Sequence, residues 1–263
     1  MTRTILYNKK KISYQVIGQG QPVILIHGFG EDGRIWKEQA LHLSGKHRLI
    51  IPDLPGSGAS EQINDMSMEG MAEVIHTIIH EEGIDACPVL GHSMGGYITL
   101  ALMEKYWNHV SAFGLVHSTA WADSDEKKEA RRKGIAFIEA NGAFPFLKTS
   151  IPNLFSPRYR EENPGIVDQF ITEQHNFSAR ALVLYYEAMM ARPDRTELLR
   201  KATVPVLFIM GEQDQAIPIS DVLQQCHLPG ISYIHILRKS GHMGMMEEKE
   251  TVNGILEKFL LSY

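Results

Sequence analysis

Unbroken apolar runs alternate with helix-like segments along the first part of this 263-residue chain. The runs are residues 22–27 (PVILIH), 48–53 (RLIIPD), 86–91 (ACPVLG) and 110–117 (VSAFGLVH). A strand that is apolar on both faces must be covered on both, as happens in a parallel sheet between two layers of helices. Between two of these runs, residues 68–79 repeat apolar side chains every three or four positions, as an amphipathic helix does. The alternation therefore predicts an α/β fold with a mostly parallel, doubly wound sheet.

The alternation is interrupted between residues 118 and 200. Here no unbroken apolar run occurs, and prolines and Gly142 separate segments of helical spacing. These helix-like segments lie at 124–140, 144–153, 163–175 and 178–192. Because the stretch contains aromatic residues and no low-complexity sequence, it predicts an ordered helical insertion rather than a flexible linker.

The strand and helix pattern returns after this insertion. We expect strands at 204–210 and 231–237, helices near 219–226 and from about 247 to 261, and two N-terminal strands at 3–8 and 11–17. Together these give a sheet of about eight strands. The sequence thus predicts one core domain formed by residues 1–117 and 201–263, with residues 118–200 inserted as a helical cap or lid.

The charge of the chain excludes a broad nucleic-acid-binding surface. Its formal net charge is −5, whereas nucleic-acid binding requires a concentrated basic patch. A local basic cluster, Lys127, Lys128 and residues 131–133, alternates with acidic side chains. Such alternation indicates a solvated helix face with pairs four residues apart. We therefore expect no nucleic-acid partner.

The cysteines and the apolar segments bear on the cellular setting. Cys87 and Cys226 lie in or near apolar segments without metal-ligand spacing, so we interpret them as reduced, buried thiols. No apolar run is long enough to span a bilayer, and the N-terminus does not resemble a signal peptide. We expect a cytoplasmic protein, monomeric or homodimeric, with no membrane partner, no metal and no cofactor.

A serine flanked by glycines follows the third buried run. Residues 91–95 read Gly-His-Ser-Met-Gly and precede a segment of helical composition at 94–107. The pattern predicts a strand, a sharp turn and a helix, with Ser93 at the bend. Glycines at this spacing relieve crowding around a strained turn, which leaves the serine hydroxyl exposed. Ser93 is therefore the candidate nucleophile.

A serine hydroxyl needs a base and an orienting acid to become nucleophilic at neutral pH. Asp214 follows the strand at 204–210, and His242 follows the strand at 231–237. Loops after parallel strands converge at one edge of the sheet, so these residues can meet Ser93 there. We expect His242 to accept and return the proton and Asp214 to orient and stabilise the imidazole.

A developing oxyanion also requires hydrogen-bond donors. The backbone N–H of Met94, at the start of the helix, is one candidate, and that of Phe29 in the sequence His-Gly-Phe-Gly is the other. The flanking glycines Gly28 and Gly30 allow that loop to turn its amide inward. We therefore expect Phe29 and Met94 to form an oxyanion hole.

Five motifs in this order resemble the α/β-hydrolase superfamily, in its capped serine hydrolase or esterase branch. They are His-Gly-Phe-Gly at 27–30, Asp-Leu-Pro-Gly-Ser-Gly at 53–58, the serine motif at 91–96, Gly-Glu-Gln-Asp at 211–214 and Gly-His at 241–242. The resemblance covers nearly the whole chain. Haloalkane dehalogenases and epoxide hydrolases of this superfamily have an aspartate where this chain has Ser93, so the resemblance favours an acyl-type serine mechanism.

Other carboxylates compete with Asp214 for the role of the acid. Glu212 and Asp221 lie nearby in sequence, and some members of the superfamily carry the acid after the preceding strand, where Asp123 and Asp125 stand here. Two further motif residues have structural interpretations. We expect His27 to hold the oxyanion loop and Asp53 to brace its own turn through backbone hydrogen bonds.

The cap is expected to supply an apolar substrate pocket. Aromatic side chains and methionines are the candidates for its walls because they offer large apolar surfaces, and methionine adapts to irregular shapes. The pocket residues we predict are Trp121, Phe144, Tyr185, Met189 and Met243.

The sequence thus predicts a serine hydrolase, carboxylesterase-like, that cleaves a small or medium apolar ester through an acyl-enzyme. A cofactor-free C–C bond hydrolase or lyase could use the same three residues, since related enzymes of both kinds carry the serine. A ligand receptor built on the hydrolase fold is an alternative of another class. The substrate itself depends on the shape of the cap.

Overall fold

Eight strands form one open sheet in the computed structural model, which describes residues 1–262. Their order across the sheet is β1-β2-β4-β3-β5-β6-β7-β8, and every neighbouring pair from β4 to β8 is parallel. The strands are β1 (Thr2–Tyr7), β2 (Lys10–Ile17), β3 (Gln21–Ile26), β4 (His47–Pro52), β5 (Cys87–His92), β6 (Val110–Val116), β7 (Val206–Gly211) and β8 (Ser232–Leu237). The predicted mostly parallel α/β sheet is confirmed.

The two N-terminal strands form the antiparallel margin of this sheet. β1 pairs with β2 and β2 pairs with β4, both antiparallel. Asn8 and Lys9 connect β1 to β2 with φ angles of 48° and 67°. Two consecutive residues in the left-handed region form the tight turn that matches the twist of a hairpin. The hairpin therefore needs no longer loop.

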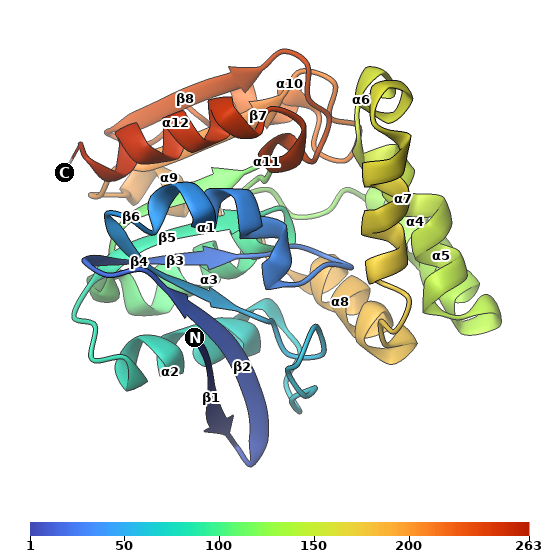
Figure 1. The fold of residues 1–263 in the computed structure, drawn as a ribbon, viewed down its shortest axis with the longest axis horizontal. Helices are drawn as coiled ribbons and strands as arrows, with labels where there is room; N and C mark the ends of the chain where they lie inside the picture. Colours follow the sequence, from blue (N-terminus) through green and yellow to red (C-terminus); the bar gives the residue numbers. More distant parts are fainter. Residues whose placement is uncertain (263) are drawn as a thin grey trace.

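Helices cover both faces of the sheet, as the unbroken apolar strands require (Figure 1). α2 (Met68–Glu81) and α3 (Met94–Tyr106) pack together on one face, and α1 (Lys37–Leu43) and α12 (Lys249–Leu260) pack together on the other. The Ser67 side chain caps α2 by accepting a hydrogen bond from the N–H of Gly70 at 3.0 Å. The shorter elements are η1 (Gly33–Trp36), η2 (Trp107–His109), α9 (Thr196–Lys201), α10 (Ile219–Leu223) and α11 (Gly244–Glu247).

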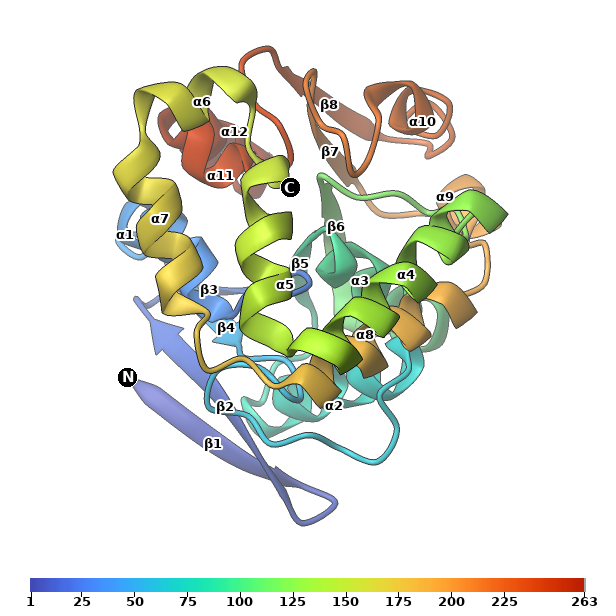
Figure 2. The same cartoon turned by 90° about the vertical axis from the view of Figure 1, so that its right-hand side faces the viewer.

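The insertion between β6 and β7 is helical and lies beyond the carboxyl ends of the parallel strands (Figures 1 and 2). It contains α4 (Asp125–Asn141), α5 (Ala143–Ser150), η3 (Ile151–Leu154), α6 (Pro157–Glu162), α7 (Pro164–Glu173) and α8 (Ala179–Ala191). α6 falls between the predicted segments 144–153 and 163–175, where the sequence indicated no helix. Proline is tolerated in the first turn of a helix, and Pro157 and Pro164 each begin one.

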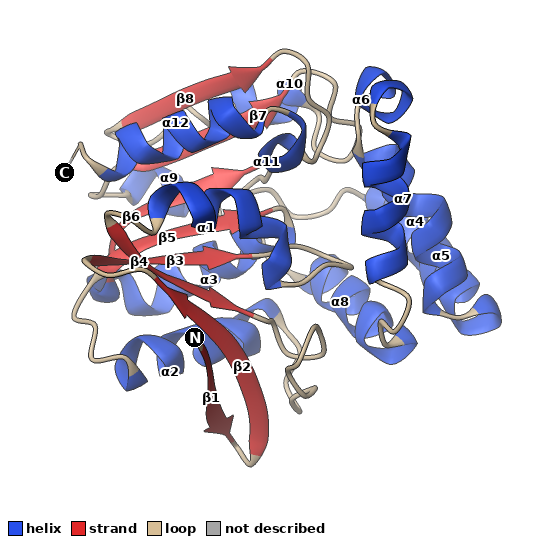
Figure 3. Cartoon of the chain, in the orientation of Figure 1, coloured by secondary structure: helices blue, strands red, loops and turns tan. Residues whose placement is uncertain are grey.

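The interior of the molecule consists of two apolar clusters, one on each side of the sheet. Cys87 and Cys226 are both buried and free, as the sequence predicted. Figure 3 shows loops at the carboxyl ends of the strands, between the sheet and the insertion. Within residues 1–262, no helix is long and apolar enough to cross a membrane.

Candidate active site

Ser93 occupies a strained turn between β5 and α3. Its backbone has φ 50° and ψ −116°, a conformation that L-residues rarely adopt. The turn leaves no room for side chains beside it: a Cβ on Gly91 would lie 2.3 Å from the backbone carbon of Gly95, and one on Gly95 would lie 2.5 Å from the carbonyl oxygen of Ile26. The glycines of the motif are therefore required by contact between the turn and its neighbours.

His242 and Asp214 form a hydrogen-bonded pair at the same edge of the sheet. Nδ1 of His242 lies 2.7 Å from Oδ2 of Asp214, and both side chains are almost fully buried. Oδ1 of Asp214 accepts hydrogen bonds from the N–H groups of Ala216 and Ile217 at 2.8 and 2.9 Å. The carboxylate is thus fixed, and it faces the ring nitrogen of His242 that points away from the nucleophile in a serine triad.

Ionisation of Asp214 is favoured strongly by its neighbours. Burial alone would raise the pKa of this carboxyl, but the charge of His242 and hydrogen bonds from His117 and His242 outweigh it and lower the pKa far below its usual range. A permanently ionised carboxylate stabilises an imidazolium beside it. Asp214 can therefore support proton uptake by His242.

Ser93 and His242 line one cavity of about 300 Å³ beneath the helical insertion. They come from the loops after β5 and β8, 149 positions apart in the numbering, and the parallel sheet brings those loops to one edge. Glu212 is exposed, and Asp123 is ion-paired with Arg131 and Arg192. Of the carboxylates weighed from the sequence, Asp214 is the one hydrogen-bonded to His242.

A second histidine contacts Asp214 from the end of β6. Nδ1 of His117 lies 3.3 Å from Oδ2 of Asp214, and the side chain is fully buried. Burial lowers the pKa of His117 to about 4, so its imidazole is neutral at pH 7. Nε2 of His117 has no hydrogen-bond partner among residues 1–262. Sequence analysis missed this residue, although the position directly after a buried strand was a usable signal.

Three of these side chains have the composition of a metal site. Ligand atoms of His117, Asp214 and His242 lie within 4.8 Å of one another. Both imidazoles, however, direct Nδ1 at the same carboxylate oxygen of Asp214. The candidate ligand atoms are thus satisfied by one another, as in a hydrogen-bonded proton-transfer group.

The two candidate oxyanion donors have free N–H groups. Phe29 lines the cavity beside Ser93, and Met94 is the first residue of α3. Neither backbone N–H donates a hydrogen bond to another of the described residues. Unpartnered donors next to a serine hydroxyl are suited to a transient negative charge.

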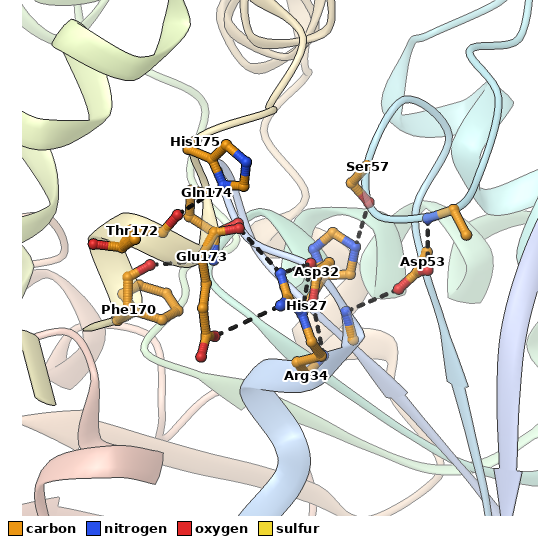
Figure 4. Close-up of polar contacts among 12 residues, drawn as sticks. His27, Asp32, Arg34, Asp53, Ser57, Phe170, Thr172, Glu173, Gln174 and His175 are labelled. Carbon is orange, nitrogen blue, oxygen red and sulfur yellow. Dashed lines mark hydrogen bonds and ion pairs between the residues drawn. The ribbon is translucent and has the colours of Figure 1, made fainter. Parts of the chain in front are cut away.

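His27 joins the loop that carries Phe29 to the loop after β4, and Figure 4 shows its contact with Ser57. Nε2 of His27 accepts from the N–H of Leu54 at 2.9 Å and lies 2.9 Å from Oγ of Ser57, while Nδ1 donates to the Gly28 carbonyl at 2.8 Å. Both ring nitrogens of His27 are therefore occupied by hydrogen bonds within the protein. Asp53 accepts from the N–H groups of Gly33 and Ala59, which confirms its predicted bracing role.

Arg34 connects this region of the core to the insertion. Its guanidinium pairs with Asp32 at 2.7 Å and also lies 3.7 Å from a carboxylate oxygen of Glu173 at the end of α7 (Figure 4). The Arg34 side chain is half exposed, so the longer contact adds little stability. It marks where α7 rests on the core.

A buried ion pair lies beside the nucleophile, and both of its residues line the cavity. Oε1 of Glu31 is 2.6 Å from Nδ1 of His92 and also accepts a hydrogen bond from the N–H of Gly28. Nε2 of His92 lies 3.0 Å from the carbonyl oxygen of His242. Burial would lower the pKa of His92, but the Glu31 carboxylate outweighs burial and raises it. Nothing in the local sequence around Glu31 distinguishes it from a surface carboxylate.

The loop of His242 is fixed by the insertion as well as by the core. The N–H of His242 donates to the carbonyl of Leu154 at 2.7 Å. The carboxylate of Glu247 accepts from the N–H of Ser156 at 2.8 Å, Gly241 at 2.9 Å and Met243 at 3.2 Å. His242 therefore sits between two residues held by one carboxylate.

The cavity walls differ from the predicted pocket. Of the five residues predicted for the pocket, Met189 lines the cavity. The other four, Trp121, Phe144, Tyr185 and Met243, do not line it. Tyr185 is fully buried and donates its hydroxyl to the carbonyl of Pro55 at 2.7 Å, and Met243 is fully buried in the core. Trp121 is half-buried, and its carbonyl accepts from Arg192 at 2.9 Å. Phe144 packs against the same apolar cluster as Met243.

Two tyrosines that line the cavity lie three or four positions from residues that the sequence identified. Tyr97 follows Ser93 by four positions, and Tyr186 precedes Met189 by three. Positions three or four apart lie on one helix face, so this spacing was the missed signal. Further lining residues are Leu154, Gln215, Ala216 and Ile217.

The basic cluster on α4 is also placed differently from the solvated face that the sequence indicated. Arg132 is exposed, as expected, and pairs with Glu129 at 3.2 Å, three positions away rather than the four that the sequence indicated. Lys127 and Arg131 instead line the cavity, together with Ala130 between them. One side of α4 therefore faces the site.

Comparison with known proteins gives a family and a set of relatives that includes several esterases and lipases. The model of the alpha/beta hydrolase family matches residues 23–254. A thermophilic esterase from Thermogutta terrifontis superposes with a TM-score of 0.92 at 27% identity, covering 99% of this chain and 98% of that one. Lipase 3 of a Moraxella species is 28% identical, over 89% of this chain and 76% of its own length.

A third relative, the pimeloyl-[acyl-carrier protein] methyl ester esterase of Vibrio cholerae, is 23% identical over 90% of this chain and 93% of its own. Esterases and lipases among the relatives support a hydrolase and, at a general level, ester hydrolysis. With the family model matching most of its length and the sheet in the same arrangement, the chain belongs to the alpha/beta hydrolase family.

Proposed function

We propose that the protein is a serine hydrolase that cleaves small or medium carboxylic esters through an acyl-enzyme. One observation carries this proposal: the Asp214–His242 pair, joined at 2.7 Å, borders the same cavity as the strained serine Ser93. A nucleophile, a base and an ionised orienting acid are the parts that acyl transfer requires. The volume of about 300 Å³ suits a small substrate.

In the proposed reaction, Oγ of Ser93 attacks the ester carbonyl carbon while His242 takes the hydroxyl proton. The tetrahedral oxyanion accepts hydrogen bonds from the N–H groups of Phe29 and Met94, each contributing about 2.7–4 kcal/mol to lowering the barrier. The bond to the alcohol oxygen then breaks, and His242 gives that oxygen its proton. Water, deprotonated by His242, attacks the acyl carbon, and Oγ of Ser93 leaves and regains its proton.

Labelling with a fluorophosphonate, followed by peptide mass spectrometry, tests the nucleophile. We expect one adduct, on Ser93, and loss of both the adduct and the hydrolysis of p-nitrophenyl esters in Ser93→Ala. A panel of esters from acetate to decanoate should show the highest kcat/KM among the shorter acyl chains. An adduct elsewhere, or undiminished turnover in the alanine variant, would contradict the proposal.

Two other functions predict different results, and each has its own assay. A C–C bond hydrolase would turn over a vinylogous 1,5-diketone in preference to p-nitrophenyl esters. A receptor would bind ligand and change the exposure of the insertion while turnover stayed negligible. Pre-steady-state kinetics with an activated ester should instead show the burst of an accumulating acyl-enzyme.

A further inference from the structure

The cavity has one wall that carries positive charge. Lys127 and Arg131 line it from α4, four positions apart and thus on one helix face. Ser93 and His242 line the same cavity from the core side. A bound molecule that reaches the serine is therefore also within the space bounded by these cations.

Arg131 is the partly exposed member of a cluster that has a surplus positive charge and whose other members, Asp123 and Arg192, are buried. Its Nε and Nη2 donate to the two oxygens of Asp123 at 2.5 and 3.1 Å. Asp123 also pairs with Nη1 of Arg192 at 2.8 Å. Two guanidinium groups thus share one carboxylate, which leaves one net positive charge. Nη1 of Arg131 has no hydrogen-bond partner among residues 1–262.

The cluster is rigid, because aromatic rings hold both guanidinium groups. Cζ of Arg131 lies 5.4 Å from the ring centre of Tyr186, and Cζ of Arg192 lies 3.8 Å from that of Tyr97. Both tyrosines line the cavity. Side chains already held in place lose little conformational entropy when a ligand binds.

The other charges around the cavity do not cancel this surplus. Glu31 is neutralised by His92 at 2.6 Å. Lys127 lies 3.6 Å from Asp221, and both side chains are partly exposed, so this contact is weak. Positive charge therefore predominates at the α4 side of the cavity.

We propose that Arg131, assisted by Lys127, binds a carboxylate of the substrate, so that the preferred esters carry a free carboxylate at the end remote from the scissile bond. The preference among esters rests on the proposed ester hydrolysis, whereas the binding of a carboxylate at Arg131 does not depend on it. The unpartnered Nη1 of Arg131 offers the donors. Tyr97, Tyr186 and Met189 also line the cavity and would contact the apolar chain of the ester between its two ends.

Matched esters test this preference. Monomethyl glutarate and O-acetyl-4-hydroxybutyrate carry the carboxylate on the acyl and alcohol halves, and methyl valerate and butyl acetate are their uncharged counterparts. We expect kcat/KM for at least one charged ester to exceed that of its counterpart about tenfold or more, as a charge-assisted hydrogen bond allows. Equal or lower values for both charged esters would overturn the inference, while hydrolysis of the neutral esters would leave the proposed function standing.

Variants on α4 locate the effect. Arg131→Gln should reduce the charged-to-neutral ratio about tenfold, and Lys127→Gln should reduce it less. Arg132→Gln removes the same charge from the adjacent, exposed position and should leave the ratio and both rates unchanged. A ratio that falls equally in Arg131→Gln and Arg132→Gln would contradict a local site.

Binding without turnover separates the two proposals. Glutarate titrated into Ser93→Ala by calorimetry should bind, and the Ser93→Ala/Arg131→Gln double variant should bind at least tenfold more weakly. Glutarate binding in a protein that hydrolyses no ester would retain the anion site and reject the esterase. If the wild-type protein hydrolyses neutral esters but Ser93→Ala does not bind glutarate, the esterase proposal stands and the anion site is rejected.

Discussion

Nε2 of His92 lies 3.0 Å from the carbonyl oxygen of His242, while its Nδ1 lies 2.6 Å from the carboxylate of Glu31. Both neighbours are acceptors, so both ring nitrogens donate and the imidazole carries a positive charge. The residue before the candidate nucleophile thus ties Glu31 in one loop to the backbone of the candidate base in another. The ion pair acts as a brace between the two sides of the site.

Removing the charge of Glu31 should weaken this brace. Glu31→Gln leaves His92 buried without its counterion, so the free energy of unfolding should fall by about 3 kcal/mol or more. Urea denaturation at pH 7 measures the change. Glu38→Gln, which breaks the exposed pair with Lys249, should cost less than about 1 kcal/mol. Equal losses in the two variants would contradict the brace.

Asp214→Asn tests the orienting acid. An amide cannot stabilise the imidazolium and can hold His242 in the wrong tautomer, so kcat should fall about 10⁴-fold with little change in KM. Steady-state kinetics with p-nitrophenyl butyrate provide the measurement. Glu212→Gln, at the exposed carboxylate two positions earlier, serves as the control and should retain wild-type kcat. A larger loss in Glu212→Gln would transfer the role to that residue.

His117 should make the protein sensitive to mild acid. Burial lowers the pKa of His117 to about 4 in the folded protein, whereas an unfolded chain has the ordinary histidine pKa of about 6.5. Between these two pH values the unfolded chain binds a proton at His117 and the folded protein does not. The associated stability is present above about pH 6.5 and is lost as the pH falls toward 4, by about 3 kcal/mol in total.

The variant His117→Asn removes this titration and keeps a side-chain donor near Asp214. The unfolding free energy, measured by urea denaturation at pH 7.0 and 4.5, should drop less in the variant than in the wild type. All other titratable groups are common to both proteins, so the difference in slope reports on His117. Identical slopes would mean that His117 titrates alike in the folded and unfolded chains.

Substitution by alanine should have opposite effects on stability at two of the glycines. A Cβ on Gly95 would approach backbone oxygens of Ile26 and His27 at 2.5 and 2.6 Å, so Gly95→Ala should destabilise the fold by about 3 kcal/mol or more and abolish activity. Gly254 lies inside α12 with nothing within 4 Å of its Cβ position. Gly254→Ala should therefore stabilise by about 0.5–1 kcal/mol, as helix propensity dictates. Thermal unfolding of the two variants measures both signs.

The residues at the strand ends could be predicted from the sequence because the sheet itself determines their positions. Ser93 and Asp214 follow the buried strands β5 and β7, and His242 follows the edge strand β8. Parallel strands bring the residues that follow them to one edge of the sheet, so the positions of these three residues depend little on the loops. The order of the strands across the sheet was less accessible, since β4 lies between β2 and β3 through contacts that no local pattern specifies.

The cavity walls could not be predicted in the same way. They depend on which face each inserted helix turns inward, and adjacent positions on a helix point about 100° apart. Tyr185 and Tyr186 illustrate this: the first is buried against Pro55, and the second lines the cavity. Glu31 shows the other limit, because its partner His92 lies 61 positions away and only the folded chain brings them together.

The attachment of His242 to the insertion couples the position of the base to that of the insertion. The base is anchored to Leu154, and Glu247 links Ser156 to both neighbours of the histidine. A hinge motion that lifted the insertion as one body would detach this loop and disable proton transfer. Residues 154–156 must therefore stay in place relative to His242 while the reaction proceeds, which makes this part of the insertion a support for the base as well as a cover for the cavity.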